Sequence, residues 1–150
     1  MTFPAQVFLL FFAVVNFFIF LKAFYECKTK QNAFGLTPRL TLIGAFVWGD
    51  AVIFGLFWTL VSIVVLFLND WLLFWLIMSL FWVVRSVGET IYWFNQQFST
   101  LDRNPPKHMK GYSIFQNDSI WFVYQIIWQC VTVVSLVFAV YFGWLWLQSL

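Results

Sequence analysis

Three ionisable side chains lie inside long apolar stretches of this chain, where a charge is costly. Asp50 interrupts the apolar run 40–68, and Arg85 and Glu89 interrupt the run 71–97. Ionisable residues in apolar spans usually face a partner or a water-filled cavity, and they often mark proton or ion pathways. The sequence therefore predicts one polar site in an otherwise apolar molecule.

The spacing of the polar residues in the second run places them together. One helix face would carry Arg85, Glu89, Tyr92 and Gln96, because they are four, three and four residues apart. Arg85 and Glu89 can pair on this face, and Asp50 on a neighbouring helix would complete an acid-base-acid cluster. Its excess negative charge would be neutralised by a proton, a cation or a base of another subunit. The alternative is an ion-pair lock that sets helix register and does no chemistry.

The composition indicates the class of protein. Of the 150 residues, 63% are hydrophobic and only 9% charged, whereas soluble domains have about 25% charged residues. We therefore expect a membrane protein surrounded by the lipid bilayer, with no nucleic-acid partner. Cys27 and Cys130 have no metal-ligand spacing and His108 is the single histidine, so we expect no metal, no other cofactor and no catalytic residues.

Four apolar stretches have the length of a membrane-spanning helix, which needs about 20 residues to cross about 30 Å of hydrocarbon. They cover residues 3–22, 40–68, 71–97 and 119–147. A single long polar loop, 99–117, separates the last two. The pattern predicts an all-α integral membrane protein, with four transmembrane helices in one domain, 1–150.

The link Asn69-Asp70 between the second and third stretches is very short. Such a link predicts a tight antiparallel hairpin of helices 2 and 3, with Asp70 as the N-cap of the latter. Counting about 20 residues inward from the link places Asp50, Arg85 and Glu89 at one level near the inner membrane boundary. The second, third and fourth helices exceed the hydrocarbon thickness, and we expect their excess length on the cytosolic side.

Basic residues predict the orientation in the membrane. Seven of the eight lie in or beside two connections: Lys22, Lys28, Lys30 and Arg39 at the first, and Arg103, Lys107 and Lys110 at the other. The positive-inside rule puts both connections in the cytosol and both termini outside, most simply in a plasma (inner) membrane. The second basic group would also attract anionic lipid headgroups.

Small residues form a stripe on the second predicted helix: Ala51, Gly55, Thr59 and Ser62. Such stripes let another helix backbone approach closely. The simpler interpretation is packing against helix 3, where Ser79 and Ser86 would be the counterpart. The alternative is homodimerisation through the stripe.

These features leave three classes of function. The first is a non-catalytic subunit or assembly partner in a membrane complex or oligomer, which the small size and the small-residue stripe favour. The second is a small oligomeric transporter or channel for a proton or cation, which would use Asp50, Arg85 and Glu89. A lipid-modifying enzyme with Asp50 or Glu89 as base and Tyr92 as acid ranks last, because no nucleophile or metal motif accompanies them. We expect the first.

Overall fold

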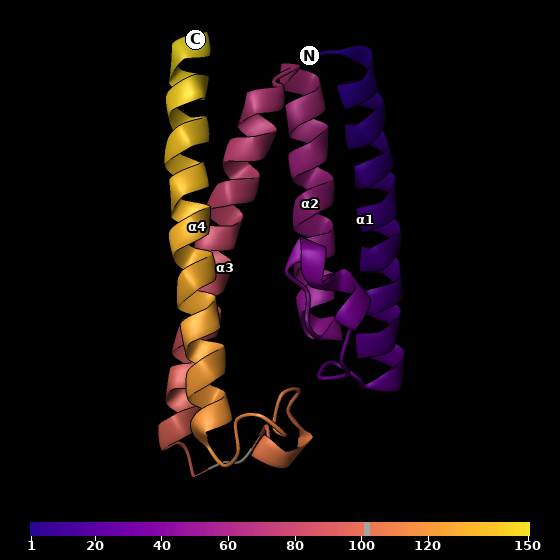
Figure 1. Cartoon of the computed structure of the whole chain (residues 1–150). Coiled ribbons are helices and arrows are strands. Elements are labelled where there is room, and N and C mark those ends of the chain that lie inside the picture. Colours follow the sequence, from indigo (N-terminus) through magenta and orange to yellow (C-terminus); the bar gives the residue numbers. More distant parts are fainter. Residues whose placement is uncertain (101–102) are drawn as a thin grey trace. The chain divides into compact units, whose positions relative to one another are not determined.

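The computed structural model describes residues 1–100 and 103–150, and most of them are helical (Figure 1). The elements in chain order are α1 (Phe3–Lys30), the 3₁₀ helix η1 (Pro38–Ile43), α2 (Trp48–Leu68), α3 (Trp71–Phe98), the 3₁₀ helix η2 (Pro106–His108) and α4 (Ser119–Ser149). In the described part of the chain, the four α-helices are long and apolar enough to cross a membrane. The chain divides into two compact units, residues 1–74 and 75–150, which are described separately; the single four-helix domain stays a prediction.

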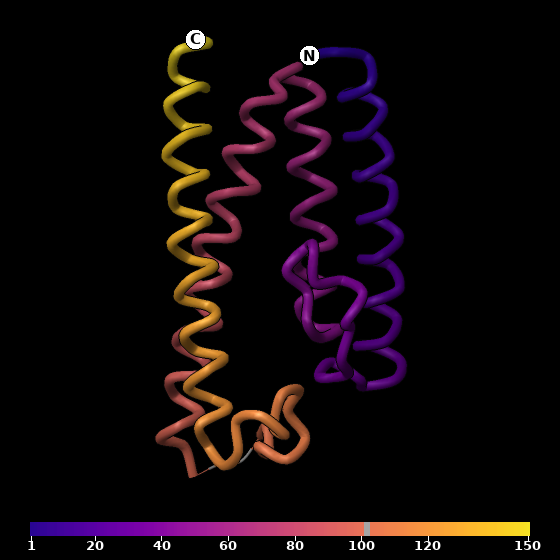
Figure 2. The backbone as a smooth tube through the Cα atoms, viewed as in Figure 1, coloured from indigo at the N-terminus to yellow at the C-terminus, as the bar shows by residue number. Residues whose placement is uncertain are grey.

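In the first unit, α1 packs antiparallel against α2 (Figure 2). At one end the Gln6 side chain donates a hydrogen bond to Asn69 Oδ1, at 3.2 Å. At the other end the Lys22 ammonium lies 5.2 Å from the centre of the Trp48 ring. Because Lys22 precedes the end of α1 by eight residues, the last two turns of α1 continue past the start of α2.

The helix that contains the first apolar stretch, 3–22, is longer than that stretch, since α1 continues to Lys30. The polar residues that follow Lys22 still favour a helix. Glu26 and Lys30 are four residues apart and form an ion pair of 2.7 Å along the helix surface. Gln31 then ends the helix in the left-handed conformation, with φ at 53°.

The second apolar stretch, 40–68, is not α-helical throughout, because α2 begins only at Trp48. Residues Pro38–Ile43 form a 3₁₀ helix, which Gly44 ends with φ at +79°. A glycine adopts this left-handed conformation without steric cost, so the chain can turn here. At 21 residues, α2 is about 31 Å long, close to the hydrocarbon thickness. The excess length expected for the second helix is therefore absent.

Aromatic pairs join α3 and α4 in the second unit. Ring centres lie 6.0 Å apart for Trp75 and Phe142, 6.5 Å for Trp82 and Trp128, and 4.8 Å for Trp93 and Tyr124. The residue numbers rise along α3 as they fall along α4, so the two helices are antiparallel. Offset or tilted aromatic pairs add about 0.5–1.5 kcal/mol each beyond the area they bury, so this aromatic seam stabilises the packing of α3 on α4.

Candidate functional site

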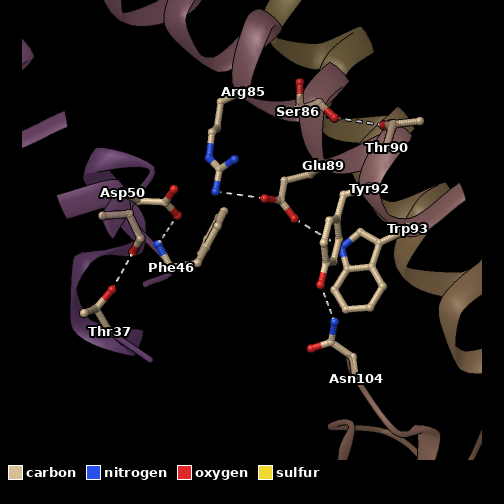
Figure 3. Close-up of polar contacts among 11 residues, drawn as sticks. Thr37, Phe46, Asp50, Arg85, Ser86, Glu89, Thr90, Tyr92, Trp93 and Asn104 are labelled. Carbon is tan, nitrogen blue, oxygen red and sulfur yellow. Dashed lines mark hydrogen bonds and ion pairs between the residues drawn. The ribbon is translucent and has the colours of Figure 1, made fainter. Parts of the chain in front are cut away.

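Asp50 lies in the first turn of α2, where its carboxylate Oδ2 accepts a hydrogen bond from the backbone N–H of Phe46 at 3.1 Å (Figure 3). The acid is the third residue of the helix and reaches back to the residue that precedes the N-cap, much as the acid of a capping box does. A negative charge is also favoured at this end of the helix dipole. This contact gives Asp50 a structural role within the first unit, as an acceptor for the backbone before α2.

Arg85 and Glu89 form an ion pair on α3, with 2.8 Å between Nη2 and Oε1 (Figure 3). Their side chains are only 16% and 12% exposed. The second carboxylate oxygen of Glu89 accepts a hydrogen bond from the Trp93 indole at 3.2 Å. Both oxygens of this acid are therefore engaged by groups of its own helix.

The other two residues of the predicted polar face lie further along α3. The Asn104 side chain donates a hydrogen bond to the Tyr92 hydroxyl (Figure 3). The backbone carbonyl of Asn104 in turn accepts from the Trp121 indole at 2.9 Å, which ties this part of the polar loop to α4. Gln96 is only 4% exposed. Tyr92 thus contacts the polar loop through Asn104, and Gln96 is buried.

The sequence placed Asp50 and the Arg85–Glu89 pair in one cluster. The structure describes Asp50 in the first unit and the pair in the second. Their common level and the acid-base-acid cluster therefore stay predictions, whereas the pair itself and the Asp50 contact with Phe46 are observed.

The predicted small-residue stripe is buried, and it packs against α1. A Cβ atom added to Gly55 would lie 2.9 Å from the backbone nitrogen of Phe20 and 3.0 Å from the carbonyl oxygen of Asn16. The Thr59 hydroxyl donates to the Gly55 carbonyl at 2.8 Å and lies 3.4 Å from the Ala13 carbonyl oxygen. Ala51 and Ser62 are fully buried on the same helix. The interpretation that helix 3 receives this stripe is corrected: at Gly55 and Thr59 its partner is α1.

The serines proposed as the counterpart of that stripe have other contacts. The Ser79 hydroxyl donates to the Trp75 carbonyl within α3, at 2.8 Å. Ser86 is fully buried, and its hydroxyl oxygen lies 2.9 Å from the Thr132 hydroxyl of α4, which donates to it. This interhelical hydrogen bond adds a polar contact to the aromatic seam of the second unit.

Two buried, hydrogen-bonded residues of the first unit, Asn16 and Trp58, are absent from the site and packing residues predicted from the sequence. Asn16 is completely buried against α2; its amide nitrogen donates to the Phe12 carbonyl at 2.8 Å, while its Oδ1 has no donor among the described residues. Trp58 is also completely buried, and its indole donates to the Ile43 carbonyl at 3.1 Å. An amide in the middle of an apolar run was a usable signal for Asn16. Nothing in the sequence singled out Trp58 among ten tryptophans.

The basic loop residues Arg103, Lys107 and Lys110 are all exposed. The segment that carries them is fixed to α4, because the Tyr124 hydroxyl donates to the Lys110 carbonyl at 3.3 Å. Their side chains are thus available to anionic groups, and headgroup binding stays a prediction.

The described helices define the class of this protein as all-helical, with four candidate membrane spans. Comparison with known proteins does not narrow this class further, since no protein family, curated protein or solved structure matches the chain.

Proposed function

We propose that this chain is a non-catalytic subunit or assembly partner of a membrane complex or oligomer. The observation that carries the proposal is the use of its polar side chains. Asp50 binds the Phe46 backbone, Glu89 binds Arg85 and Trp93, and Ser62 donates to the carbonyl four residues earlier. These groups stabilise the chain's own helices, which is the work expected of a structural component.

The outer face of α4 supplies a surface for a partner. Seven residues at alternating spacings of four and three point away from the side that packs on α3, and all are exposed: Ile126, Cys130, Val133, Val137, Val140, Trp144 and Leu147. The α3 side of the helix carries buried Ser135 and Ala139 instead. A seam with this spacing and a central run of valines suits packing against another transmembrane helix.

Photo-crosslinking in the native membrane tests this proposal. A benzophenone amino acid replaces Val137, which is 63% exposed, or in a matched control Ala139, which is 6% exposed on the same helix. Adducts with a defined protein from the Val137 position alone are expected, together with a mass in mild detergent that exceeds the single chain. Lipid adducts alone and a monomeric mass would contradict the proposal.

The alternative function is an oligomeric transporter that uses Asp50 and Glu89, and a flux assay distinguishes it from the subunit function. If the purified chain carries protons or cations into vesicles, and Glu89→Gln abolishes the flux while the protein stays folded, the oligomeric transporter replaces the subunit function. A flux that persists in the variant would show that Glu89 does not carry it, and no flux above that of empty vesicles supports the structural role.

The proposed orientation is that of a plasma (inner) membrane protein with both termini outside and both basic connections in the cytosol. It is supported by the positive-inside rule and by the Gln6–Asn69 hydrogen bond, which joins the start of α1 to the end of α2. A tight antiparallel hairpin of α2 and α3 belongs to the same proposal, since Asn69-Asp70 alone links them. Cysteines at Asn69 and Lys107 should react with an impermeant reagent from opposite sides, and reaction from the same side contradicts the orientation.

A further inference from the structure

The segment between α1 and α2 folds back beside α2. An antiparallel bridge between Leu36 and Val47 closes its base. Between these residues, η1 lies alongside the first turns of α2 (Figures 1 and 2). At its far end the Ile43 carbonyl accepts from the indole of Trp58, ten residues into α2. Residues 36–47 thus run alongside the first turns of α2 and then turn back to the point where α2 begins.

The length of α2 determines where this segment lies in a bilayer. Its 21 residues are about 31 Å long, so a span of about 30 Å of hydrocarbon needs nearly all of them. Trp48 must then lie at the membrane boundary, together with the Lys22 ammonium group that lies over its ring. Helical side chains lean toward the N-terminus, so the Ile43 carbonyl that contacts Trp58 lies about 5–10 Å inside that boundary.

Several backbone groups of this segment have hydrogen-bond partners within the protein, as a non-helical chain needs at membrane depth. The Thr37 hydroxyl donates to the Ala45 carbonyl at 3.1 Å, and the Thr37 N–H donates to the Phe46 carbonyl at 2.8 Å. Asp50 accepts from the Phe46 N–H at 3.1 Å. Together with the Trp58 bond, three side chains satisfy backbone groups that lipid could not.

Some apolar side chains of the segment face the protein and others are exposed, as expected for a segment that lies between a helix and lipid. Ile43 and Ala45 are buried against the protein. Leu42, at the tip, is 82% exposed, and Leu36, at the base, is 81% exposed. Arg39 is exposed one turn before the tip, from where a long side chain can reach back to the headgroups.

From these observations we propose that residues 36–47 form a re-entrant segment that enters the bilayer beside α2, with Leu42 among the acyl chains and Arg39 at the lipid phosphates. This inference is independent of the subunit function. In this arrangement the side chains of Asp50, Thr37 and Trp58 hold the segment in place by hydrogen bonds to its backbone.

Depth-dependent fluorescence quenching tests the inference. In a Cys27→Ser, Cys130→Ala background reconstituted in vesicles, single cysteines at Leu42, Gln31 and Leu10 carry a polarity-sensitive fluorophore. Gln31, at the end of α1, is the water reference, and Leu10, 59% exposed within the first span, is the lipid reference. The Leu42 label should be quenched by acyl-chain nitroxides as the Leu10 label is, and several-fold less by aqueous iodide than the Gln31 label.

Two results would overturn the re-entrant segment. One is a Leu42 label as accessible to iodide as the Gln31 label while the Leu10 label is lipid-quenched, because the segment then lies in water. The other is iodide access at all three positions, which contradicts insertion of the first span as well. Trp58→Phe, which keeps an aromatic ring but removes the donor to Ile43, should raise iodide access at Leu42; no change would show that this bond does not hold the segment.

Discussion

The close approach of α1 and α2 at Gly55 yields a prediction whose size follows from the geometry. In Gly55→Ala the new methyl carbon would lie 2.9 Å from Phe20 N, 3.0 Å from Asn16 O and 3.1 Å from Phe20 Cα. Contacts of this kind normally lie at about 3.5–4.0 Å. Since all three atoms belong to the α1 backbone, no side chain can swing away, and the helices must separate.

The separation has a calculable cost. A gap of about 0.5–1 Å removes a quarter to a half of the dispersion attraction of each contact between α1 and α2. Overpacking of this kind costs about 1–3 kcal/mol of folding free energy. Alanine is favoured over glycine by about 1 kcal/mol in a helix interior, which partly offsets it. Gly88→Ala is the matched control, because a Cβ atom there meets nothing within 4 Å. The control should gain stability, and Gly55→Ala should fall about 1–3 kcal/mol below it.

Unfolding by dodecyl sulfate in mixed micelles measures this difference. Buried Trp58 lies in the same unit, with its ring 6.0 Å from that of Phe12 on α1, so tryptophan fluorescence should follow separation of the two helices. An equal gain in stability for Gly55→Ala and Gly88→Ala would contradict the close approach, because α1 would then leave room for a methyl group.

Three further predictions concern hydrogen bonds and the ion pair, and the same titration measures each. Asp50→Asn keeps an acceptor for the Phe46 N–H and should change stability by less than about 1 kcal/mol, whereas Asp50→Leu should cost about 1–3 kcal/mol; equal losses would contradict the capping role. Thr132→Val removes the hydrogen bond from α4 to α3 and should cost about 0.6–1.7 kcal/mol, while Thr132→Ser should remain near the original protein, and no difference between the two would rule the bond out. Arg85→Met should destabilise more than Arg85→Met combined with Glu89→Leu, because the single change removes the cation from a poorly solvated acid; additive losses would show that the pair is not coupled.

The candidate site could be predicted only where it depends on one helix. Arg85 and Glu89 are four residues apart, and this spacing alone brings them within reach on any helix. The role of Asp50 could not be found in this way. Its acceptance of the Phe46 N–H requires the chain to leave the helix before Trp48, and residues 40–47 contain no charge or proline that signals such a break.

Composition and the length of the apolar runs predicted an all-helical chain with four helices long and apolar enough to cross a membrane, because crossing hydrocarbon demands both. They also marked Gly55 and Thr59 as packing residues, since small side chains permit close approach in any helix pair. That α1 is their partner and that residues 36–47 turn back beside α2 could be learned only from the folded chain. The reason is that both outcomes depend on contacts that helix periodicity does not predict: the α1 backbone against Gly55, and the hydrogen bonds of Trp58 and Asp50 to the backbone of Ile43 and Phe46.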